Sequence, residues 1–291
     1  MFKNLYVYLK LKLVRFIVIS VLAGFGMGFT IEQEFDLLKV ILLILGTFGI
    51  SAGSLSFNTW QEVDNDSQME RTQHRPLVTG EFSTRFAISL SLSLVILGLV
   101  CLYLVRPLTF WIGLSIIVMY NGFYTLYWKK KMAFGAVPGA LPGALPITMG
   151  YSAVNENILS SESVYLFLLM FLWQMPHFWS LAIRYKDDYA KGNFPVLPAV
   201  VGAVRTKYHI SFYVWAYAFL AMVSPLFVDF SYAYFVLVLP FSFIFIWRFF
   251  VFFKSEDPKA WFPFFMVTNF SMLIFVFSSL IDKWTPFLLN I

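Results

Sequence analysis

Long apolar runs alternate with short charged segments along most of this chain. A helix needs about 20 apolar residues to cross a hydrocarbon layer of about 30 Å, so runs near that length with charged flanks predict membrane spans. The pattern predicts an all-α, polytopic membrane protein whose nine transmembrane helices form one domain over residues 1–291. The expected spans are 13–30, 38–58, 86–105, 108–127, 133–153, 164–184, 209–228, 232–253 and 264–281.

Composition supports this interpretation, because 59% of the residues are hydrophobic, 20% are aromatic and only 13% are charged, with a mean hydropathy of +0.74. A soluble domain does not hide so much apolar surface, so the expected partner is the lipid bilayer. The span 133–153 contains Pro138, Pro142 and Pro146. Membrane helices tolerate proline where neighbours satisfy the freed carbonyl groups, and we expect this span to be buried in the bundle.

Charge is distributed unevenly between the two predicted sides of the membrane. Of 21 Lys and Arg residues, only Lys39, Arg106 and Lys283 fall on one side. Cytoplasmic loops retain positive charge, so we expect a cytoplasmic N-terminus and, after an odd number of spans, a C-terminus outside. The net charge of +5 then reflects topology and does not indicate nucleic-acid binding. The single cysteine, Cys101, excludes disulfides within the chain and cysteine metal clusters.

The first of two long cytoplasmic connections, residues 59–85, begins with an ordered set of polar side chains. Asn58, Glu62 and Asp66 are spaced four residues apart, so a continuing helix would place them on one stripe, with Asp64 pointing away. An amide and two carboxylates can supply oxygen ligands to Mg²⁺, which needs only one or two carboxylates beside phosphate oxygens and water. The alternative is a solvated, mixed-charge loop.

Basic residues accompany these acids. Arg71 and Arg75 follow closely, and guanidinium groups match phosphate oxygens in a bidentate manner. At the end of the fourth span, Tyr124 lies near Lys129, where one lysine could meet a phosphate. An aromatic belt with a positive cytoplasmic anchor is the simpler explanation of most residues there.

The second long connection, residues 185–208, also begins with acids and bases. If the sixth span continues as a helix, Arg184 and Asp188 share a face with His177, and this face would look towards Asn58. Asp187 and Asp188 could be metal ligands or a charge cluster that marks the membrane interface. His177 could contact a substrate, or it could be an interior histidine bonded to a carbonyl group.

Three segments together resemble the UbiA superfamily of intramembrane prenyltransferases: NTWQEVDNDSQMERTQHRPLVTG, PGALPITMGY and PHFWSLAIRYKDDY followed by FPVLP. Within the superfamily, the first and third segments are similar to the branch that farnesylates protohaem IX. The resemblance implies a nine-helix bundle around a central cavity in the cell inner membrane, with the active site on the cytoplasmic side.

This resemblance also implies the chemistry. A farnesyl group would move from farnesyl diphosphate to a vinyl group of haem B, giving haem O and diphosphate, with Mg²⁺ as cofactor. The implied metal ligands are Asn58, Glu62, Asp66 and Asp188, with Asp187 as a further catalytic acid. The implied diphosphate ligands are Arg71, Arg75, Lys129, Arg184 and Lys186. Haem A synthase and terminal oxidase assembly proteins are candidate partners.

Aromatic faces can stabilise an allylic cation while excluding water. The residues expected to line the prenyl and haem pocket are Phe57, Trp60, Tyr124, His177, Phe178 and Trp179. The chain departs from the family pattern at Glu62, where the N-x-x-x-D-x-x-x-D motif has Asp, and in LKLKLVRF, where haem-modifying members carry Lys-Pro-Arg.

Two rival interpretations remain open from the sequence. A quinone precursor or another lipid could be the prenyl acceptor, because the metal site would be the same. A transporter or a non-catalytic oxidase assembly factor would belong to a different class. A transporter would more naturally place its ionisable residues near the bilayer midplane, whereas these cluster at one interface.

Overall fold

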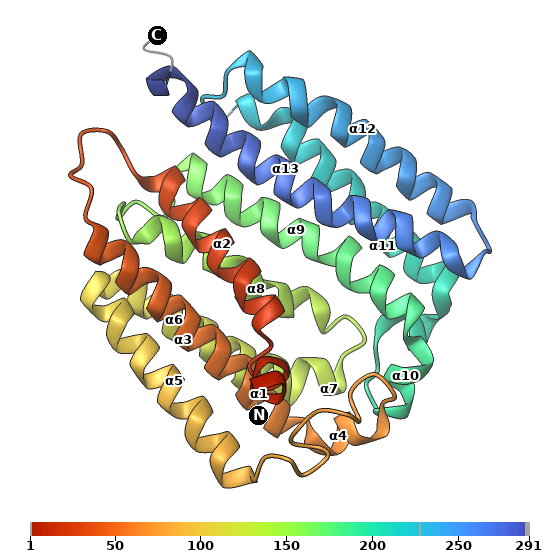
Figure 1. The fold of residues 1–291 in the computed structure, drawn as a ribbon. Helices are drawn as coiled ribbons and strands as arrows, with labels where there is room; N and C mark the ends of the chain where they lie inside the picture. Colours follow the sequence, from red (N-terminus) through yellow and green to blue (C-terminus); the bar gives the residue numbers. More distant parts are fainter. Residues whose placement is uncertain (1, 227, 289–291) are drawn as a thin grey trace. The chain divides into compact units, whose positions relative to one another are not determined.

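A computed structural model describes residues 2–226 and 228–288, and over these ranges the chain is helical and contains no strand (Figure 1). Eight helices in the described part are long and apolar enough to cross a membrane. The protein is therefore a multi-pass membrane protein, as predicted. The spans are α2 (Leu11–Gly28), α3 (Leu37–Gln61), α5 (Thr84–Val105), the segment Pro107–Lys131, α9 (Ser161–Arg184), α11 (Leu197–Val223), α12 (Tyr232–Lys254) and α13 (Trp261–Leu288).

The fifth expected span, 133–153, is not among these eight, and corresponds to a shorter helix, α8 (Ala136–Ser152), of 17 residues. It contains Pro142 and Pro146 and most of its second half is buried, which confirms the expected burial. Its close neighbour is α2, where a Cβ on Gly24 would lie 1.9 Å from the Ile147 carbonyl oxygen. Only glycine allows the two backbones to approach so closely.

Side-chain caps fix where several long helices begin. The Asp36 carboxylate accepts a hydrogen bond from the Lys39 backbone N–H at the start of α3. Ser83 accepts in the same way from Phe86 at the start of α5. Such caps satisfy backbone donors that the first helical turn leaves without partners.

The seventh span begins earlier than the sequence predicts. The hydrophobic pattern indicated a start at residue 209, whereas α11 begins at Leu197. Gly202, with φ of 83°, interrupts its helical backbone, and the charged residues Arg205 and Lys207 follow before the long apolar run. Hydrophobicity locates the membrane-embedded part of a helix, but it does not mark the helical turns that extend beyond it.

The chain divides into two compact units, Met1–Glu156 with Asp187–Val196, and Asn157–Lys186 with Leu197–Ile291. The single domain expected for residues 1–291 stays a prediction. We describe each unit by itself.

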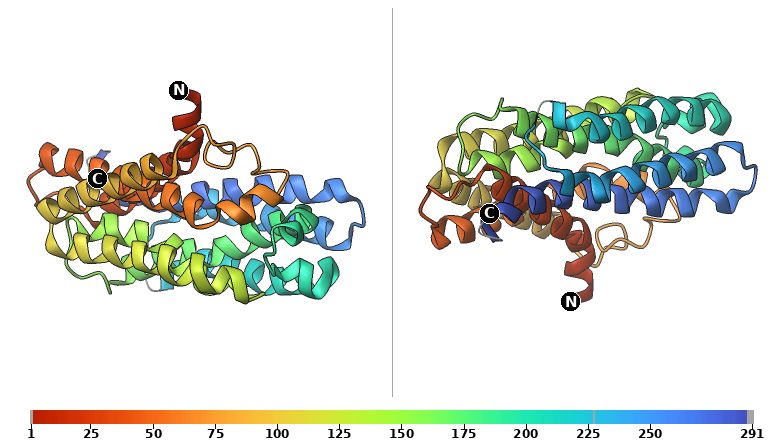
Figure 2. Two further views of the ribbon diagram at one scale, coloured as in Figure 1. Left: turned by 90° about the horizontal axis from the view of Figure 1, so that it is seen from below. Right: turned by 90° about the horizontal axis from the view of Figure 1, so that it is seen from above.

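In the first unit, α3 packs against α5, and α2 packs against α8. The two views in Figure 2 show the short helix α1 (Phe2–Tyr8) on the same side of this unit as the loop of residues 69–83. The remaining elements of the unit are α4 (Val63–Gln68), α6 (Pro107–Ile117), the π-helix η1 (Val118–Trp128), α7 (Lys129–Lys131) and α10 (Lys186–Lys191), whose first residue belongs to the second unit.

In the second unit, α9 packs against α11 and α13, and α12 packs against α13. The buried carboxylate of Asp282 accepts hydrogen bonds from the backbone N–H groups of Ser231 and Tyr234, at 2.8 and 3.0 Å, and so caps the start of α12. Burial of this carboxylate is tolerated because it is hydrogen-bonded, and its charge in turn fixes the start of the helix.

Candidate active site

The predicted stripe of Asn58, Glu62 and Asp66 is broken at its middle residue. Helix α3 ends at Gln61, Glu62 adopts φ −115° and ψ 14°, and α4 then begins. The expectation of one continuous helix is therefore wrong. The three side chains nevertheless are all buried, with exposed fractions of 2%, 2% and 1%. Backbone hydrogen bonds from Glu62 N–H to the Asn58 carbonyl at 3.1 Å and from Asp66 N–H to the Glu62 carbonyl at 2.8 Å continue across the break. Asp64 is exposed, as expected.

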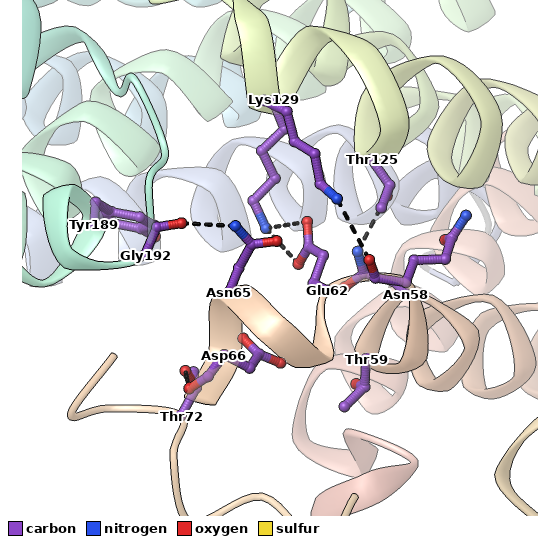
Figure 3. A network of polar contacts seen from close by, with 12 residues as sticks. Asn58, Thr59, Glu62, Asn65, Asp66, Thr72, Thr125, Lys129, Tyr189 and Gly192 are labelled. Atoms are coloured by element: carbon purple, nitrogen blue, oxygen red, sulfur yellow. Dashed lines mark hydrogen bonds and ion pairs between the residues drawn. The ribbon is translucent and has the colours of Figure 1, made fainter. Parts of the chain in front are cut away.

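Each of these three polar side chains has a cationic partner. The Lys129 ammonium group donates to both carboxylate oxygens of Glu62 at 2.7 Å (Figure 3). Arg75 forms an ion pair with Asp66. Lys10 donates to the Asn58 amide oxygen at 3.0 Å. The first unit thus gathers three cations around two carboxylates in a region that is almost closed to water.

Lys10 was not predicted from the sequence as a residue of the site, because it is only one of several positive charges in the N-terminal segment. Lys10 lies between α1 and α2 with a left-handed backbone, φ 51° and ψ 42°. Burial, together with the charge of the neighbouring Arg75, lowers the pKa of its ammonium group to about 7, although Glu62 and Asp66 oppose this shift. A sequence signal existed, since Lys10, one of the basic residues of LKLKLVRF, stands directly before the first span.

The π-helix η1 supplies a second layer of contacts to the end of α3. The Thr125 hydroxyl accepts from the Asn58 amide at 3.1 Å and donates to the carbonyl of Tyr120, five residues earlier. Asn121 donates to the side chain of Gln61 at 3.0 Å. π-Helical turns are rare and occur frequently at functional sites. An apolar pattern does not distinguish a π-helix from an α-helix, so the sequence predicted an ordinary span here.

Asp188 lies in the first unit, next to the loop that follows α4. Its Oδ1 atom accepts from the Glu70 backbone N–H at 2.7 Å, whereas its buried Oδ2 atom has no hydrogen-bond partner. In a second hydrogen bond, the Asn65 amide donates to the Gly192 carbonyl at 2.8 Å (Figure 3). The structure therefore places Asp188 against Glu70 in the loop that follows α4, and its meeting with Asp66 at one metal ion stays a prediction.

Surface contacts strengthen the same junction. Lys191 and Glu70 form an ion pair at 2.5 Å, and this hydrogen bond lowers the pKa of Glu70 and raises that of Lys191. The Arg71 guanidinium lies 5.6 Å from the centre of the Tyr189 ring. Asp187, by contrast, is exposed on α10.

The second predicted stripe is also interrupted. Helix α9 ends at Arg184, Tyr185 has φ −111° and ψ 24°, and α10 is a separate helix. The expected continuous helix through His177, Arg184 and Asp188 is therefore wrong. Arg184 and Lys186 are exposed in the second unit, and the Arg184 guanidinium lies 5.7 Å from the centre of the Tyr185 ring.

Some of the aromatic residues expected to line the pocket lie on two different helices of the first unit. Tyr124 on η1 stacks on Tyr120 at 5.7 Å between ring centroids and interacts electrostatically with Glu62. Phe57 and Trp60 lie 5.0 Å apart on α3, and Trp60 packs against the buried cluster beneath α1.

The other aromatic candidates lie on α9 in the second unit. The His177 imidazole lies between Trp173 and Phe265, at 4.7 and 4.9 Å between ring centroids, and its buried Nδ1 atom has no hydrogen-bond partner among the described residues. Phe178 is 38% exposed, whereas Trp179 is buried. The side chain of His177 is thus held by aromatic faces on α9 and α13.

The donor set of the first unit fits Mg²⁺ better than a transition metal. In the described part of the chain, no group of three or more His, Cys, Asp or Glu side chains gathers at one point. Mg²⁺ requires fewer protein ligands, because phosphate oxygens and water complete its octahedron. The buried oxygens of Asn58, Glu62 and Asp66, together with the unpartnered Oδ2 atom of Asp188, are of the required type.

Comparison with known proteins decides the family. Residues 17–276 match the UbiA prenyltransferase family. The protoheme IX farnesyltransferase of Bdellovibrio bacteriovorus is 44% identical over 275 residues, which cover 94% of each chain. The enzyme of the same name from Francisella tularensis subsp. novicida is 38% identical over 67% of this chain and 69% of its own.

The chain belongs to the UbiA prenyltransferase family. Solved structures agree on the fold of this prenyltransferase. A structure described as digeranylgeranylglyceryl phosphate synthase has a TM-score of 0.80 at 19% identity and covers 98% of this chain and 99% of its own. A UbiA homolog from Archaeoglobus fulgidus bound to GPP and Mg²⁺ has a TM-score of 0.62 at 17% identity and covers 95% and 99%.

Proposed function

We propose that this chain is a protohaem IX farnesyltransferase, which transfers the farnesyl group of farnesyl diphosphate to a vinyl group of haem B and so forms haem O and diphosphate. The observation that carries the proposal is the 44% identity to the protoheme IX farnesyltransferase of Bdellovibrio bacteriovorus over 94% of both chains. The buried cluster of acids, amide and cations in the first unit supports it, because a diphosphate leaving group needs such a site.

Asn58, Glu62, Asp66 and Asp188 would hold Mg²⁺. Bound there, Mg²⁺ would act as a Lewis acid that neutralises the charge developing on the departing diphosphate. The metal-bound UbiA homolog of Archaeoglobus fulgidus supports the choice of metal for this fold. Asp187, exposed on α10, is proposed as a further catalytic acid next to Asp188.

The cations of the cluster have a second task. In the structure, Lys129 and Arg75 are paired with Glu62 and Asp66, and Lys10 with Asn58. When diphosphate and metal bind, these amines and the guanidinium can turn from the acids to the phosphate oxygens. Fixed donors aimed at developing negative charge need little reorganisation during the reaction. Arg71, Arg184 and Lys186 are exposed and would attract the anion at the membrane surface.

Loss of diphosphate leaves an allylic cation on the farnesyl chain. Tyr124 and Tyr120, stacked close to Glu62, offer π-faces that would stabilise this cation next to the site of its formation. Phe57 lies one residue before Asn58 and contacts Trp60, so it would bound the same region. The haem vinyl group would then attack the cation, and water would add to the resulting carbocation and release one proton to give the hydroxyethylfarnesyl group.

In the second unit, we propose that His177, Phe178 and Trp179 take part in binding the acceptor. The aromatic surroundings of His177 favour a flat apolar partner such as a porphyrin. An imidazole within a membrane helix usually faces protein or ligand, because lipid offers no hydrogen bond to it.

Location and orientation follow from charge and substrate. We place the protein in the cell inner membrane with a cytoplasmic N-terminus and an external C-terminus, since all but three of its 21 Lys and Arg residues flank the same predicted side. The active site then lies at the cytoplasmic interface, where soluble diphosphate can leave.

Mass spectrometry of haems extracted from membranes tests the proposed function. Membranes that contain this protein, farnesyl diphosphate and haem B should accumulate a haem whose mass is increased by one farnesyl group and one hydroxyl group, C15H26O in total. A prenylated quinone precursor without prenylated haem would show that the acceptor is different. Absence of every prenylated product from membranes that contain the folded protein would refute prenyl transfer.

A further inference from the structure

Lys10 owes its position to a helix that is too short to be stable alone. Helix α1 has seven residues, and isolated helices of that length are marginal in water. The left-handed backbone of Lys10 is disfavoured for a residue with a side chain and persists only where the surroundings hold it. Contacts outside Lys10 must therefore keep its ammonium group against Asn58.

Tyr8, two residues before Lys10, makes those contacts. Its side chain is 1% exposed, and its hydroxyl donates to the Ala87 carbonyl at 2.9 Å and lies 3.0 Å from the Ser91 hydroxyl. Its ring packs edge-on against Phe82, with centroids 5.5 Å apart. Tyr8 thus ties α1 to the first two turns of α5.

The same hydrogen-bond chain continues to the metal-binding helix. The Ser91 hydroxyl lies 2.8 Å from that of Ser56, which also donates to the Ala52 carbonyl of α3 at 2.7 Å. Ser56 stands two residues before Asn58, the residue that Lys10 contacts. A buried network of this kind is rigid when every member is satisfied. Tyr8, Ser91 and Ser56 therefore join α1, α5 and α3 on the side of Lys10.

We propose that Tyr8 is a positioning residue, whose hydroxyl anchors α1 on α5 and so holds the Lys10 ammonium group where it contacts bound diphosphate. The proposal rests on one part of the proposed function, namely that the first unit binds diphosphate. It does not depend on the prenyl acceptor.

Tyr8→Phe provides the direct test, because phenylalanine keeps the ring packing and removes only the hydroxyl. Without the Tyr8 hydroxyl, the Ala87 carbonyl still lies within helix α5 and the Ser91 hydroxyl still contacts that of Ser56. The variant should therefore remain folded. Tyr6→Phe is the matched control on the same helix. The Tyr6 hydroxyl lies at the surface, where it accepts a hydrogen bond from the Arg15 guanidinium at 3.3 Å.

The measurement is the affinity of the full-length protein in lipid nanodiscs for inorganic diphosphate in the presence of Mg²⁺, by calorimetry. We expect Tyr8→Phe to weaken binding about fivefold, as the loss of one buried hydrogen bond would, and Tyr6→Phe to leave it unchanged. In a Lys10→Met background, Tyr8→Phe should cause no further loss, because its effect passes through Lys10.

An equal loss in both backgrounds, or no loss in either, would overturn the proposal. Absence of diphosphate binding by the unaltered protein would overturn it too, whereas binding without haem farnesylation would refute only the acceptor. If Tyr8→Phe does not fold, Ser91→Ala replaces it in the same double-variant cycle, because it removes the next hydroxyl of the network.

Discussion

The ammonium group of Lys129 lies 2.7 Å from each carboxylate oxygen of Glu62, although 67 positions separate the two residues in the chain. Glu62 is 2% exposed, so this contact compensates a carboxylate that is almost removed from water. The Lys129 ammonium group also lies 4.4 Å from the centre of the Phe194 ring. One lysine thus links the break between α3 and α4, the end of η1 and the segment after α10.

Replacement of Lys129 by methionine should therefore reduce both stability and activity. Removal of one partner from a buried ion pair costs about 3 kcal/mol or more, because the remaining charge is left uncompensated. Thermal unfolding in detergent and the rate of prenyl transfer measure the two effects. Lys131→Met is the control, since Lys131 is exposed on the same helical segment. Equal loss in both variants would contradict a specific role of Lys129.

Asp66→Asn and Asp188→Asn should each lower prenyl transfer on the order of 100-fold while the protein stays folded in membranes, because each removes a charge aimed at the metal and diphosphate. The isosteric amide keeps the volume of each side chain. Asp64→Asn is the matched control, because Asp64 lies on α4 beside Asp66 but is exposed. Formation of haem O at the normal rate by either buried variant would remove the metal-site assignment.

The middle acid of the first motif gives a prediction about metal affinity. Glu62→Asp keeps the charge and shortens the side chain by one methylene, so it should lose one of the two contacts with Lys129. We expect a severalfold change in the Mg²⁺ concentration that gives half-maximal activity, with EDTA abolishing the activity of both forms and Mg²⁺ restoring it. Activity that survives exhaustive chelation would argue against a metal-dependent mechanism.

His177→Phe should weaken the use of the acceptor, haem B, without affecting the use of the donor, farnesyl diphosphate. Phenylalanine retains the packing between Trp173 and Phe265 and removes both ring nitrogens. The KM for haem B should rise by about tenfold, as expected when a buried polar contact to a ligand is lost, while the KM for farnesyl diphosphate stays nearly constant. A parallel rise of both KM values would instead assign His177 a structural role.

The sequence by itself determined the membrane class, the approximate spans and the segments that carry the chemistry. Hydrophobicity is a property of each residue, so a run of apolar residues reveals a membrane helix wherever it later packs. The spacing and type of Asn58, Glu62 and Asp66 likewise indicated a metal site, since oxygen ligands are visible in the sequence.

Only the tertiary structure decided which side chains meet. The break at Glu62, the separate helix α10 and the π-helical turns of η1 each change the direction of side chains, and no local pattern encodes them. Lys10 reaches Asn58 across 48 positions because Tyr8 holds α1 against α5. Such contacts depend on the packing of helices that are distant in the sequence. Packing energy arises between two surfaces in contact, whereas a local sequence pattern describes only one of them.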